Sequence, residues 1–191
     1  MKKSAYVIIV ILLSFSSRLQ GQPGTTELMT EIKKISSMVD NLSHRFDILE
    51  KKIDDVQWYN KAGDIAYIDK VYMTGPPLAK EINPTGQGAG NPVKFWAYIF
   101  IPKDADPGKK YPLLVFPHGG VHANFDTYYT HIIREMVSQG YIIVAAEYRG
   151  STGYGSSMYN KIDYGGLEVE DVDASRQYMI DNYTIVDKDR V

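Results

Sequence analysis

Three patterns of hydrophobic and polar residues follow one another along the chain. Residues 5–15 form a nearly unbroken apolar run, AYVIIVILLSF, which two lysines precede. Residues 25–57 contain neither Pro nor Gly and repeat their apolar residues in steps of four and three. In residues 58–191, apolar runs alternate with turn-rich stretches and with amphipathic segments. We therefore predict a leader over 1–21, a long amphipathic helix over 25–57 and an α/β domain over 58–191.

The first segment is typical of a secretory signal peptide. Lys2 and Lys3 form a charged start, and the small polar stretch SSRLQGQPG follows the apolar run. The run is too short to span a membrane comfortably. Cleavage after Gly21 would place a small residue at −1 but Leu19 at −3, and the alternative is an uncleaved N-terminal anchor. Either reading places the rest of the protein outside the cytoplasm, secreted or periplasmic.

The second segment predicts a coiled coil, because its apolar residues keep to the a and d positions of four heptads. Arg45 at g and Glu50 at the following e form the only good ion pair between helices. We expect a homo-oligomer through residues 28–56, without deciding between a dimer and a trimer. The alternative is an amphipathic helix that folds back on its own domain. The heptad residues are Leu28, Ile32, Ile35, Val39, Leu42, Phe46, Leu49, Ile53 and Val56.

The third segment predicts the front part of a sheet covered by helices. Its first two strands form an expected antiparallel pair, and the next two are continuous apolar runs separated by a helix. Such runs are typical of a parallel sheet that is buried on both faces. The expected strands are Ile65–Met73, Val93–Ile101, Tyr111–Phe116 and Tyr141–Glu147, and the expected helices are about Asp126–Gln139 and Leu167–Asn182.

Composition excludes several classes of function. With 21 Lys and Arg against 23 Asp and Glu, the net charge is −2, and no basic cluster points to nucleic acid. The chain has no Cys, which excludes disulfides, thiolate catalysis and zinc–thiolate sites. A hydrophobic content of 44% with 12% aromatic residues is enough for a core and excludes wholesale disorder.

The loop after the third predicted strand carries the first candidate chemistry. It reads His118-Gly119-Gly120-Val121, so two glycines follow a strand directly. In α/β-hydrolases this strand-to-helix loop supplies one oxyanion-hole donor, and the lipase form is H-G-G-G. Here the third glycine is absent, and a Gly-Gly pair also occurs in ordinary turns after a strand.

Further motifs extend this picture to residues 111–191. They are YPLLVFPHGG, SQGYIIVAAEYRGSTGYG, GGLEVEDVDASRQYMIDN and VDKDRV. Together they resemble the prolyl oligopeptidase family of serine peptidases, which belongs to the α/β-hydrolase superfamily. The resemblance implies the N-terminal half of an α/β-hydrolase sheet. It also implies that Gly119 and Gly120 belong to the oxyanion-hole loop, and that His118 stands where one branch of the family has an oxyanion-stabilising Tyr.

The Y-R-G-S-T-G-Y-G loop that begins at Tyr148 matches the family's signature. Arg149 needs an acidic partner if it is buried, and Glu170 or Asp171 at the start of the following helix would supply it. We read these charges as structural. Ser151, Ser156 and Ser157 fit turn and cap positions better than the position of a nucleophile.

The catalytic triad itself is expected outside this sequence. No G-x-S-x-G motif occurs, and in the family this elbow follows a V-D-x-x-R-V stretch such as the one that ends at Val191. We therefore expect the N-terminal fragment of a secreted serine hydrolase, inactive by itself, whose complete form acts on a peptide or ester substrate without a cofactor. The alternatives are a carboxylesterase of the same fold and a secreted coiled-coil binding or scaffold protein with a non-catalytic hydrolase remnant.

Overall fold

A computed structural model of the protein describes residues 23–81 and 83–191, so the predicted signal peptide lies outside the described residues. The chain divides into two compact units, the residues before His44 and the unit His44–Val191. None of the helices in the described ranges is long and apolar enough to cross a membrane. In chain order the elements are α2 (Pro23–Ala62), β1 (Ala66–Thr74), β2 (Lys94–Pro102), β3 (Tyr111–Val115), the 3-10 turn η1 (Thr127–Tyr129), α3 (Thr130–Ser138), β4 (Ile142–Glu147), α4 (Ser156–Tyr159), α5 (Leu167–Asn182) and β5 (Val186–Asp187).

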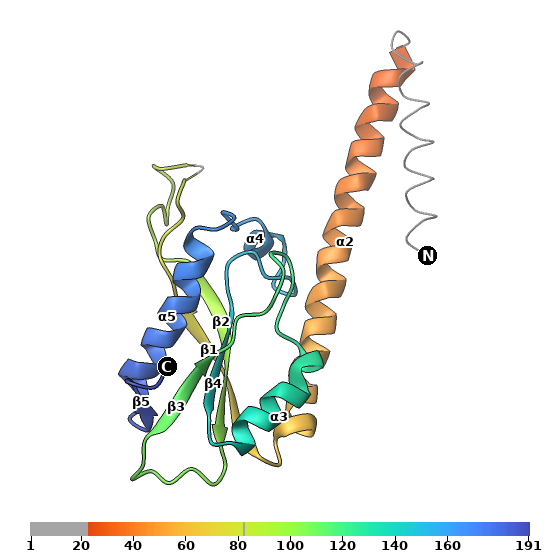
Figure 1. Ribbon diagram of the computed structural model, residues 1–191. Coiled ribbons are helices and arrows are strands. Elements are labelled where there is room, and N and C mark those ends of the chain that lie inside the picture. The colour runs from red at the N-terminus through yellow and green to blue at the C-terminus, as the bar shows by residue number, and fades with distance from the viewer. Residues whose placement is uncertain (1–22, 82) are drawn as a thin grey trace. The chain divides into compact units, whose positions relative to one another are not determined.

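The unit His44–Val191 is built on a mixed sheet with the order β1-β2-β4-β3-β5 (Figure 1). Strands β1 and β2 pair antiparallel along their whole length, and β2 pairs antiparallel with β4. Strand β3 runs parallel to both β4 and β5. The expected antiparallel pair and the expected parallel strands are therefore both present, joined in one sheet.

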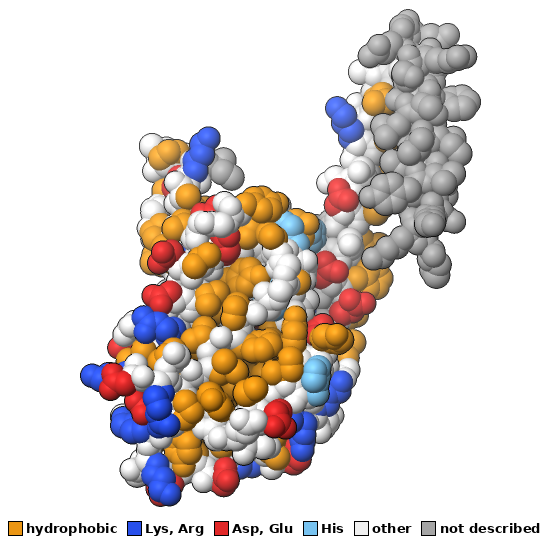
Figure 2. Space-filling model, in the orientation of Figure 1, with side chains coloured by type: hydrophobic (Ala, Val, Ile, Leu, Met, Phe, Trp, Pro, Cys, Tyr) orange, Lys and Arg blue, Asp and Glu red, His pale blue; other side chains and the backbone are white. Residues whose placement is uncertain are grey.

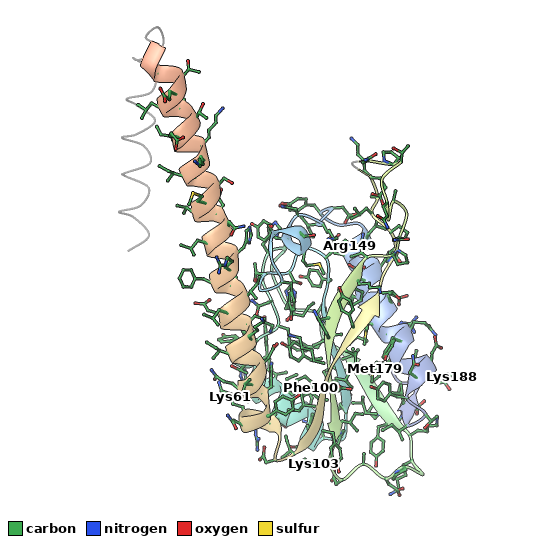
Figure 3. All side chains as sticks on the ribbon, turned by 180° about the vertical axis from the view of Figure 1, so that it is seen from behind. Lys61, Phe100, Lys103, Arg149, Met179 and Lys188 are labelled. Carbon is green, nitrogen blue, oxygen red and sulfur yellow. The ribbon has the colours of Figure 1, made fainter. Side chains whose placement is uncertain are left out.

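Two apolar layers cover the two faces of this sheet. Met179 of α5 belongs to one layer, together with every second residue of β2 and β4. Phe100 belongs to the other layer, which contains the inner face of α3 and the last turns of α2. Figure 3 labels both residues, and Figure 1 shows α5 and α3 on opposite sides of the sheet. A strand alternates its side chains between faces, so β2 feeds both layers.

Helix α2 is longer than the predicted 25–57 and uses a different face from the heptad stripe to contact the α/β unit. Lys51, Trp58 and Ala62 are at most 3% exposed, whereas the nine residues at a and d are 38% to 64% exposed. Lys51 and Trp58 both fall at f, opposite the a/d stripe. The last turns of the helix therefore fold back on the domain while their apolar stripe faces outward.

The predicted helix after β3 is split in two. The side chain of Asp126 accepts a hydrogen bond from the Tyr128 N–H and caps η1, and α3 follows without a break in the chain. The short helix α4 lies in a stretch for which sequence analysis predicted turns and caps only. Helix α5 has the predicted bounds.

Candidate functional site

The predicted oxyanion-hole loop follows the carboxyl end of β3. Gly119 and Gly120 are exposed, and Gly120 has a φ of +79°, in the left-handed region that favours glycine. The loop is anchored before it turns, since the Phe116 N–H donates to the carbonyl of Val144 at 2.8 Å. Both glycines thus lie where backbone N–H groups can reach solvent beside the parallel strands.

His118 turns its imidazole into the protein. The side chain is buried, its ring stacks on Tyr148 with 4.2 Å between centroids, and Nε2 lies 2.9 Å from the Ser151 hydroxyl. Burial lowers the pKa of His118 to about 4, so the ring is neutral near pH 7. The sequence predicted that His118 belongs to the oxyanion-hole loop. In the structure the ring of His118 faces the protein interior.

Ser151, His118 and Glu147 have the composition of a catalytic triad but a different geometry. Nε2 of His118 faces both the Ser151 hydroxyl and a Glu147 oxygen 3.6 Å away, whereas in a triad the acid binds the other ring nitrogen. Ser151 is fully buried and donates its hydroxyl proton to the Tyr148 carbonyl at 2.6 Å. This serine supports the turn, as expected, and cannot reach a substrate.

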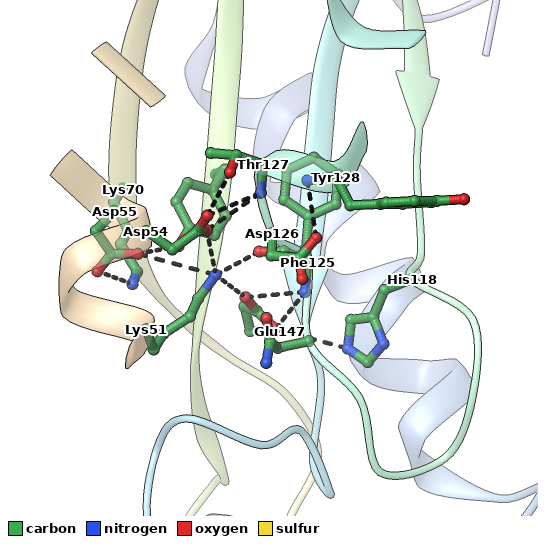
Figure 4. Close-up of polar contacts among 12 residues, drawn as sticks. Lys51, Asp54, Asp55, Lys70, His118, Phe125, Asp126, Thr127, Tyr128 and Glu147 are labelled. Atoms are coloured by element: carbon green, nitrogen blue, oxygen red, sulfur yellow. Dashed lines mark hydrogen bonds and ion pairs between the residues drawn. The ribbon is translucent and has the colours of Figure 1, made fainter. Parts of the chain in front are cut away.

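Glu147, the last residue of β4, is the centre of a buried polar network (Figure 4). Its carboxylate accepts hydrogen bonds from the Phe125 N–H at 3.2 Å and from the Tyr154 hydroxyl at 3.1 Å. Lys51 Nζ lies 3.0 Å from one of its oxygens. Burial raises the pKa of Glu147, and the Lys51 ammonium opposes that shift. The carboxylate is thus satisfied by three different segments.

Helix α2 reaches this network through Lys51. Its ammonium also donates to the Phe125 carbonyl and lies 3.6 Å from an Asp54 oxygen. Asp54 in turn accepts hydrogen bonds from the Thr127 N–H at 3.0 Å and from its hydroxyl at 2.6 Å. The segment 125–127, which follows the predicted oxyanion-hole loop, therefore contacts both the end of β4 and helix α2.

A second buried ion pair closes the signature loop. Arg149 and Asp171 are both fully buried, and the guanidinium forms two hydrogen bonds of 2.8 Å with the carboxylate. Arg149 also donates to the Pro76 carbonyl at 2.7 Å. Of the two acidic partners considered from the sequence, Asp171 is the one in contact, while Glu170 is exposed. The complete burial of Arg149 and Asp171 is consistent with the prediction that their charges support the structure.

An open hollow lies beside Lys51, between helix α2 and the loop after the glycines. The side chains of Asn124 and Thr152 on its wall are joined by a hydrogen bond of 2.9 Å. Four carboxylates face one ammonium there, so the hollow is negatively charged. It is lined by Asp47, Glu50, Lys51, Asp54, Asn124, Asp126 and Thr152.

Comparisons with known proteins match the C-terminal part of the chain to a peptidase family. Residues 127–191 match the prolyl oligopeptidase family. The probable dipeptidyl-peptidase 5 of Aspergillus flavus is 33% identical over 104 residues, which are 52% of this chain and 14% of that protein. Dipeptidyl peptidase 8 of Homo sapiens is 31% identical over 103 residues, 50% of this chain and 12% of the relative.

Solved structures of two hydrolases share the fold of this chain. A puromycin-hydrolyzing peptidase of Mycobacterium tuberculosis superposes with a TM-score of 0.50 and 27% identity, covering 64% of this chain and 18% of that one. A puromycin hydrolase superposes with a TM-score of 0.50 at 22% identity, over 65% of this chain and 18% of the other. The chain thus spans less than a fifth of the relatives it matches. The family resemblance and the α/β-hydrolase fold predicted from the sequence are confirmed.

Sequence analysis missed Lys51 and Glu147. One lies within a helix read for its heptads, and the other is a single acidic residue at a strand end. Only the three-dimensional structure shows that the two side chains form an ion pair.

Proposed function

We propose, from the match of residues 127–191 to the prolyl oligopeptidase family, that this chain is part of a serine peptidase of that family. The observation that carries the proposal is the position of Gly119 and Gly120. They lie at the carboxyl end of a parallel strand, in a sheet that superposes on a peptidase at 27% identity. In such a sheet, this loop faces the turn that carries the nucleophile.

The mechanism proposed for the complete protein is acyl transfer. A serine hydroxyl from a part of the complete protein outside these residues attacks the acyl carbon, and a histidine takes the hydroxyl proton. The carbonyl oxygen becomes an oxyanion, and an N–H group of the glycine loop stabilises its charge. The histidine then gives its proton to the departing amine, and water releases the acyl group by the same steps.

The edge of β3 supports this proposal. The Leu113 N–H donates to the Arg190 carbonyl at 2.9 Å, so the chain already runs beside β3 there. Leu114, Val115 and Phe116 remain half-buried. Figure 2 shows hydrophobic side chains gathered on this face of the unit, between α5 and α3. A continuation of β5 along the rest of β3 would cover them and lead to the proposed nucleophile.

A fluorophosphonate probe tests the proposal on the protein from its natural source. We expect a labelled species well above 22 kDa that contains peptides of this sequence, with the label on a serine in a G-x-S-x-G motif. An unlabelled protein that carries these peptides would refute the serine-peptidase function.

We also propose that residues 22–191 are inactive by themselves. Purified residues 22–191 should not hydrolyse a p-nitrophenyl ester, because the triad lies elsewhere. Hydrolysis that disappears when Gly119 is replaced by Pro, which has no N–H, would contradict this expectation.

The substrate class separates the peptidase from a carboxylesterase of the same fold. We propose a peptide substrate, since the named relatives are dipeptidyl peptidases. The full-length protein should cleave dipeptide p-nitroanilides. Cleavage of p-nitrophenyl esters but of no peptide amide would favour the esterase.

A second proposed function is assembly of copies of this chain through the heptad stripe of α2, residues 28–56. All nine stripe residues are exposed, although long helices gain most of their stability from burying an apolar face. Because the domain contacts the f face at Lys51 and Trp58, a second copy can bind the stripe without competing for that face. Arg45 and Glu50 would pair across a parallel assembly.

Sedimentation of the full-length protein tests this assembly. Leu42→Asp combined with Leu49→Asp should convert the oligomer to a monomer, because it places charges in the stripe. Ser37→Asp, at an exposed f position of the same helix, is the matched control and should leave the mass unchanged. A wild-type protein that sediments as a monomer would refute the assembly.

We also propose that the protein works outside the cytoplasm, because Lys2, Lys3 and the apolar run after them have the pattern of a secretory leader. Mass spectrometry of the N-terminus in the secreted or periplasmic fraction should find a chain that begins near residue 22. Recovery of the intact N-terminus in the cytoplasm would contradict secretion.

A further inference from the structure

The hydroxyl of Tyr148 lies inside the turn of the glycine loop and touches two of its carbonyl groups. The distances from this hydroxyl are 2.8 Å to the Gly120 oxygen and 3.0 Å to the His118 oxygen. Its ring is buried and stacks on the imidazole of His118 with an interplanar angle of 16°. The hydroxyl also lies 3.2 Å from Nδ1 of His118. Its contacts with the two carbonyls hold both at the same side of the loop.

The planarity of the peptide group converts these two contacts into an orientation of N–H groups. No peptide bond of the described chain is cis, so each C=O points opposite to the N–H of the next residue. When the carbonyls of His118 and Gly120 face Tyr148, the N–H groups of Gly119 and Val121 face away from it. These two residues are exposed, which places the N–H groups on the solvent side.

The two N–H groups are also free to act as donors. In residues 23–81 and 83–191, the N–H groups of Gly119 and Val121 donate to no backbone carbonyl and no side chain. Because both residues are exposed, these N–H groups are left to water or to a bound substrate. Free donors fixed by a rigid support are what stabilisation of an oxyanion requires.

We infer that Tyr148 is a positioning residue, which holds the glycine loop so that one of its outward N–H groups serves as the loop donor of the oxyanion hole. This inference rests on the proposed function, since it assigns a task within that site. Gly120 contributes the left-handed turn of the loop, with a φ of +79°.

Tyr148→Phe tests the inference, because it removes the hydroxyl and keeps the ring that stacks on His118. Tyr128→Phe is the matched control, since Tyr128 is 76% exposed and its hydroxyl forms no hydrogen bond with any residue that the structure describes. In the full-length protein, Tyr148→Phe should slow the reaction with the fluorophosphonate about tenfold, the factor that one hydrogen bond can supply. For a p-nitrophenyl ester, kcat should fall while KM stays within about twofold. The control should react like the wild type.

A second measurement does not depend on activity. In full-length protein labelled with 15N-glycine, Tyr148→Phe should shift the Gly119 signal and lower its order parameter from the rigid value of about 0.85. If the wild type reacts with the probe and Tyr148→Phe reacts equally fast, the inference is overturned and the proposed function stands. If the wild type does not react, the proposed function fails, and an unchanged Gly119 signal in Tyr148→Phe then overturns the inference as well.

Discussion

The side chains of Lys51 and Glu147 illustrate how a buried charge depends on its partner. Lys51 is 3% exposed and Glu147 is fully buried, so water screens neither of them. A buried pair contributes little compared with apolar residues of the same size, but the loss of one partner leaves the other charge uncompensated. The pair is therefore a strong constraint on where helix α2 lies against β4.

The first prediction follows from the cost of leaving one buried charge without its partner. Lys51→Met should lower the free energy of unfolding by about 3 to 5 kcal/mol at pH 7, because Glu147 loses its counter-charge. Adding Glu147→Gln should recover much of the loss. Urea denaturation measures both, and Lys52→Met, at an exposed position, is the control. A loss below 1 kcal/mol for Lys51→Met would show that the pair is not the link between helix and sheet.

The second prediction concerns pH and His118. Burial lowers the pKa of this imidazole from 6.5 to about 4, while the unfolded chain keeps the higher value. The unfolded state therefore binds the proton more tightly, and stability falls as pH decreases from about 6.5 to about 4, by up to about 3 kcal/mol. The groups that face the ring are Glu147, Lys51, Tyr148 and Ser151.

The difference in unfolding free energy between wild type and His118→Gln should therefore shrink between pH 7 and pH 4.5. An NMR titration of the imidazole C–H of His118 gives the pKa directly. A midpoint near 6.5 would mean that the ring is solvated, contrary to its position in the structure.

At the scale of elements, the last turns of helix α2 are part of the hydrophobic core of the α/β unit. Trp58 is fully buried, and its ring stacks on Phe125 at 5.1 Å and meets Phe100 edge-on at 5.0 Å. The heptad pattern alone did not predict this contact, because Trp58 lies outside the a and d positions. A periodicity identifies the stripe of a helix, and a single large residue off that stripe can still decide what the helix packs against.

The third prediction tests this packing. Trp58→Ala should cost about 3 to 5 kcal/mol of stability, since it removes a fully buried aromatic ring and leaves a cavity. Tyr59→Ala is the control in the same turn, because Tyr59 is 58% exposed. Thermal unfolding followed by circular dichroism compares the two. Equal effects would mean that the end of α2 does not contribute to the core.

Most element boundaries were predictable within a few residues. The apolar strands and helix α5 follow from residues that are neighbours in sequence. Helix α4 was not predicted, because its four residues are too few to establish a helical period. Asp126 was expected within a helix, but its carboxylate caps the 3-10 turn η1 that follows it, because a short acidic side chain readily binds a nearby backbone N–H.

At the scale of the whole unit, Arg149 ties three distant segments together. Its guanidinium binds Asp171 on α5 and the carbonyls of Pro76 and Pro77, and it lies just beyond the end of β4. The motif of the signature loop predicted that Arg149 needs an acid. It could not predict the two proline carbonyls, because they belong to a loop far away in sequence. The candidate site shows the same division: the glycines were visible in the sequence, and the contacts that Tyr148 makes with their loop were not.

The fourth prediction compares two arginines. Arg149→Met should cost about 3 to 5 kcal/mol, because Asp171 remains buried without a partner. Arg176→Met removes an exposed ion pair with Asp173 and should cost less than about 1 kcal/mol. Denaturation in urea distinguishes these outcomes. Similar small losses for both would show that the buried pair is dispensable.

The distance along the chain between Lys51 and Glu147 has a consequence for how the protein is made. Glu147 is synthesised about a hundred residues after Lys51. At translation rates of roughly 5 to 20 residues per second, helix α2 waits about 5 to 20 seconds for its partner to emerge. During that interval the ammonium stays hydrated and the helix cannot dock in its final place. The N-terminal segment is thus the first to be made and one of the last to be fixed.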